Sequence, residues 1–246
     1  MTSITPENLL EELRRAADVV TGIAVKLGDQ DVQAPSELPG WTRGHVLAHL
    51  TGIGNAMARQ AEYAARGESI ELYDGGFEGR TRAIELAAGH SAEEHRAAVA
   101  AAFERALTAF GALDAAGWQE PISYRGGVVF DGGLALWREL TIHATDLGTG
   151  RGPETWSKPF CEHLFDFLAA RVPEGERFVL QPLGLPSVTI GAAGGRSTAI
   201  NGMLTDIAAW LAGRTPTLGS LRATAAADGV DLPELLPWPA GVPVTR

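Results

Sequence analysis

The chain has 246 residues, a formal net charge of −10 and one cysteine. Its length allows one large domain or two smaller ones whose cores need no disulfides, and a single cysteine excludes both an internal disulfide and a multi-cysteine metal site. The acidic residues are spread along the chain and Lys and Arg form no run, which argues against a nucleic-acid partner.

The N-terminus begins with a helix signal. Thr5 can act as the N-cap with Pro6 at the first helical position, and apolar residues then recur at helical spacing as far as Gly28. The opening residues MTSITPENLLEELRR contain no apolar segment behind basic residues, and no window approaches ~18 uninterrupted apolar residues. We therefore expect a cytoplasmic protein that is neither secreted nor membrane-spanning.

Three further long helices are predicted from capping residues and apolar periodicity. They cover approximately residues 43–65, 91–113 and 134–147. Residues 68–80 are expected to form a loop before a short helix, and SYRGGVVFDGG a hairpin or a loop. Four long helices joined by polar, glycine-rich connections favour a four-helix bundle.

The rest of the chain has a different character. A helix is expected over about residues 158–172, with Cys161 as a buried, small apolar residue rather than a nucleophile. Beyond Pro173, RFVLQPL and SVTIG have the pattern of strands, MLTDIAAWLAGR that of a helix, and LPELLPWPAGVPVTR that of a loosely structured tail. We expect the α+β class, with the helical bundle over residues 1–172 and a small α/β domain over residues 173–246.

Two of the predicted helices carry metal-binding side chains four residues apart. His45 and His49 lie in WTRGHVLAHL, and Glu139 and His143 lie in WRELTIHATDLG. Residues at this spacing share one face of a helix, and facing helices of a bundle can build a metal site between them. Two imidazoles and a carboxylate suit Zn²⁺ with one open position. The pattern leaves open which of the two histidines in the first helix is a ligand, and whether these are ordinary hydrogen-bonded side chains.

A resemblance to a known family rests on the same motifs. LPGWTRGHVLAHL followed by WRELTIHATDLG resembles the mycothiol-dependent maleylpyruvate isomerase family, whose N-terminal domain belongs to the DinB-like superfamily of metal-binding four-helix bundles. LYDGGFEGRTRAIELAAG and AAWLAGRTP extend the resemblance over most of the chain, weakly after Pro173. It implies that His49, Glu139 and His143 are the metal ligands, with His45 one turn away as a candidate residue of the cofactor pocket. It also implies two cofactors, a divalent metal, expected to be Zn²⁺, and mycothiol.

The resemblance further implies an activity. In this family the metal lowers the pKa of the mycothiol thiol, and the thiolate adds to the cis double bond of maleylpyruvate. The resulting single bond rotates, and elimination of the thiol releases fumarylpyruvate. Cations are needed for the substrate carboxylates and the enolate. The resemblance points to Arg214 for a catalytic role, with Arg43 as a second candidate, and Arg80 and Arg82 are candidates to line the cofactor pocket. Each arginine also has a purely structural or solvated alternative.

The substrate is less constrained than the site. The expected partners are a small thiol and a small electrophile, with no nucleic acid and no membrane, and the protein is expected to be a monomer. One alternative is a thiol S-transferase that conjugates mycothiol to another electrophile. Another is a non-catalytic, metal-binding or ligand-binding regulator, against which the intact ligand set argues. High Ala, Gly and Arg with low Lys is compatible with an actinobacterial genome.

Overall fold

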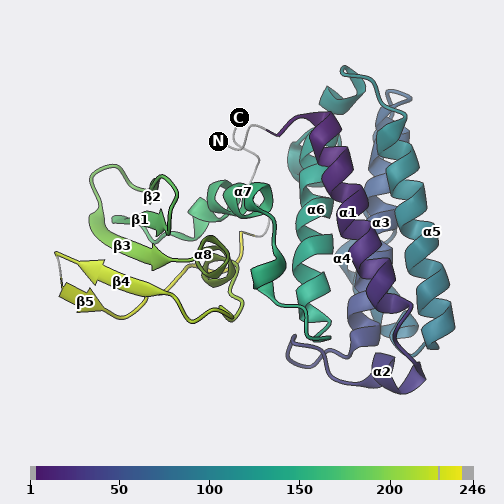
Figure 1. The fold of residues 1–246 in the computed structure, drawn as a ribbon. Helices are drawn as coiled ribbons and strands as arrows, with labels where there is room; N and C mark the ends of the chain where they lie inside the picture. Colours follow the sequence, from purple (N-terminus) through teal and green to yellow (C-terminus); the bar gives the residue numbers. More distant parts are fainter. Residues whose placement is uncertain (1–3, 227, 240–246) are drawn as a thin grey trace. The chain divides into compact units, whose positions relative to one another are not determined.

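The computed structural model describes residues 4–226 and 228–239. It divides into two compact units, one from Ile4 to Gly150 and one from Arg151 onward (Figure 1). Within the described residues, no helix is both long enough and apolar enough to cross a membrane.

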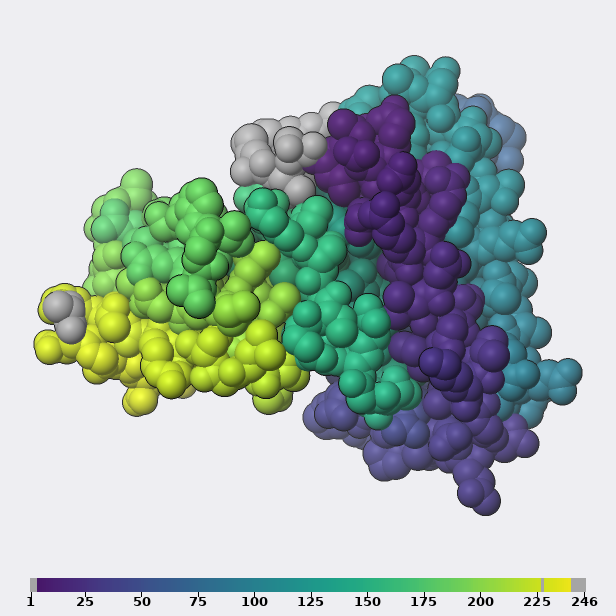
Figure 2. Space-filling view, in the orientation of Figure 1, coloured from purple at the N-terminus to yellow at the C-terminus, as the bar shows by residue number. Residues whose placement is uncertain are grey.

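The N-terminal unit is a four-helix bundle. Its long helices are α1 (Pro6–Ala24), α3 (Arg43–Ala64), α5 (Ala92–Gly111) and α6 (Val129–Asp146). Both α1 and α3 pack against α5 and α6, so the four helices close into a ring with a shared apolar core. The outer side of α1 remains at the surface along one side of the bundle (Figure 2). Helices α3 and α6 are neighbours, as expected, so the two histidine-containing motifs lie together.

Shorter elements connect the long helices. They are α2 (Asp29–Gln33), α4 (Gly76–Ala87), η1 (Gly117–Gln119) and η2 (Tyr124–Gly126). Helix α4 packs on α3, and it begins inside the segment that the sequence predicted as a loop. Close packing at the start of α3 requires a glycine: a Cβ on Gly44 would lie well under 3.0 Å from the carbonyl oxygen of Ala88 and 3.2 Å from His95 Nε2.

Helix α6 begins earlier than the sequence indicated. Its first residue is Val129 rather than Leu134, and the Asp131 carboxylate accepts a hydrogen bond from the Val128 N–H (2.9 Å) at its N-terminus. Glycine usually disfavours a helix, but Gly132 and Gly133 lie inside this one. A Cβ on either would come within 3.0 Å of a neighbouring apolar side chain, so both positions favour glycine. They allow close packing against the rest of the bundle.

The C-terminal unit combines two helices with a five-stranded sheet. The sheet order is β2 (Val188–Gly191), β1 (Glu176–Pro182), β3 (Arg196–Gly202), β4 (Arg222–Ala225) and β5 (Asp228–Val230). Strands β1 and β3 are parallel and the other pairs are antiparallel. The helices are α7 (Lys158–Leu168) and α8 (Leu204–Leu211), with short turns η3 (Pro153–Thr155) and η4 (Ala169–Arg171).

The division between the units falls after Gly150, whereas the sequence pattern predicts it after Val172. The reason is that α7 buries its apolar face against α8 of the C-terminal unit. Cys161 lies in that face and is fully buried, as expected. Residues 232–239 of the Pro-rich tail have no regular structure, although the Leu236 N–H donates to the Arg171 carbonyl (2.8 Å). Residues 240–246 lie outside the described residues.

Candidate metal centre

Helix α3 presents two histidines one turn apart in different settings. His45 lies at the helix N-terminus, where its Nδ1 accepts from the Thr42 N–H (3.2 Å) and its own N–H donates to the Thr42 hydroxyl (3.3 Å). Its Nε2 faces Glu85 Oε2 at 3.5 Å. His49 lies deeper, with only 4% of its surface exposed. The His45 ring is therefore engaged in capping α3, whereas the His49 ring is directed into the bundle.

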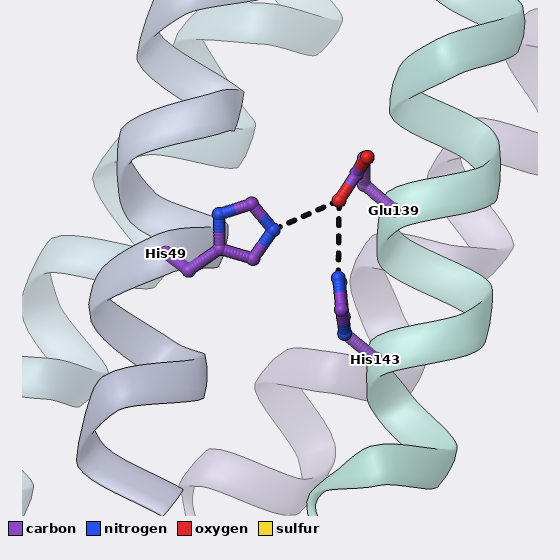
Figure 3. Close-up of side chains that lie close together, drawn as sticks. All are labelled: His49, Glu139 and His143. Carbon is purple, nitrogen blue, oxygen red and sulfur yellow. Dashed lines mark hydrogen bonds and ion pairs between the residues drawn. The ribbon is translucent and has the colours of Figure 1, made fainter. Parts of the chain in front are cut away.

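Three side chains meet between α3 and α6 (Figure 3). His49 Nε2 lies 2.8 Å from Glu139 Oε2, and His143 Nε2 lies 3.1 Å from the same oxygen. The two imidazole rings are 4.7 Å apart and perpendicular, at 89°. One possible ligand atom from each residue lies within 4.8 Å of the other two. These are the three residues that the resemblance implied as ligands, and His45 is not part of the group.

Asp146 completes the setting of His143 and was missed in the sequence. Its carboxylate is fully buried at the end of α6 and lies 2.7 Å from His143 Nδ1. A carboxylate at this position holds a proton on Nδ1 and directs Nε2 toward the cluster, as in many metal-ligating histidines. The signal was present as Asp three residues after His in HATD, a spacing that places both side chains on one helix face.

The three residues of the cluster have shifted pKa values. Burial alone would raise the pKa of the Glu139 carboxyl, but hydrogen bonds from His143 and His49 hold it well below its usual range. Burial would lower the pKa of His143, yet hydrogen bonds to Asp146 and Glu139 raise it to about 9. For His49, burial prevails and lowers the pKa. A neutral and a protonated imidazole thus share one ionised carboxylate.

Arg80 and Tyr73 lie against the cluster from the side of α4. Arg80 Nη2 is 2.9 Å from His49 Nδ1, and its guanidinium lies over the Tyr73 ring, 5.9 Å from the centroid. Burial raises the pKa of Tyr73 to about 12, so its phenol keeps its proton at neutral pH. Sequence reasoning selected Arg80 but not Tyr73, which lies in a segment expected to be a loop.

The other three predicted arginines make hydrogen bonds or ion pairs with groups outside the cluster. Arg43 donates to the carbonyls of Leu147 (2.7 Å) and Gly148 (3.0 Å), so it joins the start of α3 to the end of α6. These bonds favour the structural alternative for Arg43. The exposed Arg82 faces Glu78 at 3.7 Å. Arg214 belongs to the C-terminal unit, where its Nη1 donates to the Ala212 carbonyl (3.0 Å) at the end of α8.

A further arginine, Arg138, was overlooked. It directly precedes Glu139 in α6 and is 93% withdrawn from solvent, with 7% of its surface exposed. Burial lowers the pKa of its guanidinium, and a hydrogen bond with Tyr124 opposes that shift. The sequence offered no signal for it, because a charged residue in an amphipathic helix is normally assigned to the solvent side.

The protein has two units, a helical bundle and a small α/β unit. Two histidines and a glutamate converge between two helices of the bundle and form a candidate metal centre. Residues 7–148 match the model of the mycothiol maleylpyruvate isomerase N-terminal domain, and residues 155–237 match that of the MDMPI C-terminal domain. The chain belongs to the mycothiol maleylpyruvate isomerase family, which is a family of enzymes.

Solved structures with the same fold include two of the mycothiol-dependent maleylpyruvate isomerase. The crystal structure of that protein has a TM-score of 0.81 and 21% sequence identity, and the alignment covers 94% of this chain and 96% of that one. A histidine-to-alanine mutant of it gives a TM-score of 0.80 and 20% identity over the same shares. No sequence among the curated proteins matches this chain. At this identity the structural likeness shows the fold.

Proposed function

We propose that this protein is a mycothiol-dependent isomerase that converts maleylpyruvate to fumarylpyruvate, with a divalent metal, Zn²⁺, held by His49, Glu139 and His143. The observation that carries the proposal is the convergence of two imidazole nitrogens on one carboxylate oxygen. It occurs in a chain whose two units both match this family, and the solved structures of like fold bear the name of this isomerase.

The residues fit such an ion. Catalytic zinc sites take three protein ligands from nitrogen, sulfur and oxygen donors and keep one position open. Here the donors are two imidazoles and a carboxylate that is ionised, because its pKa is held well below the usual range. Asp146 beside His143 supplies the outer hydrogen bond that such a ligand requires. The open position would receive the sulfur of the thiol.

The chemistry follows from these cofactors. When bound, the metal and mycothiol would together supply a thiolate that adds reversibly to the cis double bond of maleylpyruvate, so that the bond can rotate before elimination. The protein's own groups would orient the metal ligands and stabilise negative charge on the substrate. Asp146 keeps the proton on His143 Nδ1, and the protonated Tyr73 phenol and the Arg80 guanidinium offer donors for the negative oxygens of the substrate.

Roles for the remaining predicted residues stay predictions. Arg214 keeps its proposed role toward a substrate carboxylate, and Arg43 its weaker one. His45 and Arg82 keep theirs toward the thiol, although the hydrogen bonds of His45 favour support of α3. That the enzyme is a monomer in the cytoplasm also stays a prediction.

The proposal is tested by an absorbance assay with maleylpyruvate, run with and without mycothiol on the Zn²⁺-loaded protein. We expect conversion to fumarylpyruvate that requires mycothiol and does not consume it. If the protein binds Zn²⁺ and mycothiol but leaves maleylpyruvate unchanged, the isomerase is refuted. Family membership would then favour the alternative, a thiol S-transferase acting on another electrophile, because one thiolate site can serve different electrophiles.

A further inference from the structure

Arg80 contacts His49 on the ring nitrogen that points away from Glu139. The distance from Arg80 Nη2 to His49 Nδ1 is 2.9 Å. A guanidinium has five N–H donors and no acceptor, so His49 Nδ1 must accept this hydrogen bond through its lone pair. The proton of the neutral imidazole is then on Nε2, which donates to Glu139 Oε2 at 2.8 Å. The hydrogen bonds with Arg80 and Glu139 therefore favour one tautomer of His49.

In this tautomer His49 Nε2 has no lone pair for a metal, because it donates its proton to Glu139. A neutral histidine that binds a metal through Nε2 carries its proton on Nδ1, and that N–H needs an acceptor. For His49 it would instead face an N–H of Arg80. His143 differs, because its Nδ1 faces the Asp146 carboxylate. That carboxylate stabilises a proton on Nδ1, as in the tautomer that binds a metal through Nε2. The two histidines therefore differ at Nδ1, where His143 has an acceptor and His49 has a donor.

We propose that Arg80 and the metal bind His49 alternately, and that Arg80, once released by the metal, binds a carboxylate of the substrate beside the metal. The inference rests on the metal site of the proposed function and adds to it an order of events. A metal-free site keeps its guanidinium on His49 and lacks the anion-binding group, whereas a metal-loaded site exposes it.

The surroundings of Arg80 support the second half of this proposal. Arg80 is half-buried and its guanidinium lies over the Tyr73 ring, so an N–H that no longer donates to His49 is available to another acceptor beside the cluster. A carboxylate fits a guanidinium with two parallel hydrogen bonds. The protonated Tyr73 phenol on the same side offers a further donor for that carboxylate.

The tautomer of His49 is a direct test that needs no variant of Arg80. Protein labelled with ¹⁵N-histidine is examined by long-range ¹H–¹⁵N correlation at pH 7.5, with the His49 signals assigned by their loss in His49→Ala. We expect the proton on Nε2 in the metal-free protein and on Nδ1 after Zn²⁺ is added. A metal-free protein with the proton on Nδ1 would overturn the proposal.

Metal affinity gives a second test, in which removal of a side chain is expected to strengthen Zn²⁺ binding. Arg80→Met removes the competing donor and is expected to tighten Zn²⁺ binding about tenfold in competition with a chromophoric chelator, since hydrogen bonds to charged groups contribute at about this level. Arg82→Met is the matched control, because it removes the same charge from the exposed side of the same helix, and it should leave the affinity unchanged. Equal affinities in Arg80→Met and wild type would refute the alternation.

The anion-binding half is tested with maleate, a stable dicarboxylate probe, by calorimetric titration of Zn²⁺-loaded protein. Arg80→Met should weaken maleate binding about tenfold, Arg80→Lys less, and Arg82→Met not at all; unchanged binding in Arg80→Met would overturn this half. If the protein takes up no Zn²⁺, the proposed function fails along with the alternation. A protein that binds Zn²⁺ with His49 already protonated on Nδ1 in the metal-free state overturns the alternation alone.

Discussion

Two alanine substitutions in α3 are expected to change stability in opposite directions. Gly44 and Gly52 lie eight residues apart in the same helix, so the chemical change is identical and only the surroundings differ. A Cβ on Gly44 would overlap the carbonyl oxygen of Ala88 and lie 3.2 Å from His95 Nε2, whereas a Cβ on Gly52 would meet no atom within 4 Å.

The magnitudes follow from these distances. An ordinary C···O contact is about 3.3 Å or longer, so Gly44→Ala would push the start of α3 away by roughly 1 Å; over-packing of this kind costs about 1–3 kcal/mol. Gly52→Ala gains up to about 1 kcal/mol, because alanine favours a helix interior over glycine. In a unit of this size about 1 kcal/mol shifts the melting temperature by roughly 2–4 °C. We therefore expect a fall of about 2–12 °C for Gly44→Ala and a rise of up to about 4 °C for Gly52→Ala.

Circular dichroism at 222 nm during thermal unfolding measures both variants, since helices dominate that signal. Zinc affinity should separate them too, because His49 lies in the turn after Gly44 and would move with it. The reasoning is refuted if Gly44→Ala melts at or above the wild-type temperature. A destabilised Gly52→Ala would equally contradict the open surroundings of Gly52.

Four further predictions concern other sites. His49→Ala should abolish Zn²⁺ binding, whereas His45→Ala should leave the metal content near wild type; equal loss by metal analysis would overturn the ligand assignment. Asp146→Asn should weaken Zn²⁺ affinity about 10- to 100-fold in chelator competition, and an unchanged affinity would exclude an orienting role. Because burial raises the pKa of Cys161 to about 12, a disulfide reagent at pH 8 should label it only after unfolding in urea; stoichiometric labelling of the native protein would disprove its burial. Asp206 accepts three hydrogen bonds that lower its pKa although burial alone would raise it, so Asp206→Ala should cost about 2 kcal/mol at neutral pH. That cost should shrink as the pH falls below about 4, the ordinary carboxyl pKa, and a cost independent of pH would contradict the ionised, bonded carboxylate.

The sequence predicted the bundle well because its long helices carry local signals. Thr5 and Thr42 cap α1 and α3 through their hydroxyls, at the positions that the pattern indicated. The start of α6 was misplaced because Gly132 and Gly133 are there to allow close packing, a tertiary requirement that helix propensity does not contain.

The C-terminal unit was predicted only in part, since strand pairing is not a local property. β1 and β2 have apolar, β-branched runs, but β3, in RSTAING, is polar and glycine-containing, and it joins the sheet because it pairs in parallel with β1. The assignment of α7 to the wrong unit has the same origin. Its apolar face was evident, but the helix that covers it, α8, comes after three strands.

The site shows the same division. Helical spacing selected Glu139 and His143 as a pair, and the resemblance selected His49 over His45. What spacing could not supply was the contact of Arg80 with His49, because that guanidinium reaches the cluster from α4, a separate helix. Spacing places Asp146 on the helix face of His143, but the structure is needed to show that it meets Nδ1 of that histidine.

The separation of the cluster along the chain has a consequence for biosynthesis. His49 and Glu139 are 90 residues apart, and α6 is the last helix of its unit to leave the ribosome. When α1, α3 and α5 have left the ribosome, the nascent chain still lacks Glu139 and His143, two of the three proposed ligands. An ion held by all three can therefore bind only after α6 has docked, and by mass action it would favour the completed bundle over every partly folded form. Metal uptake would then report the final step of folding in this unit.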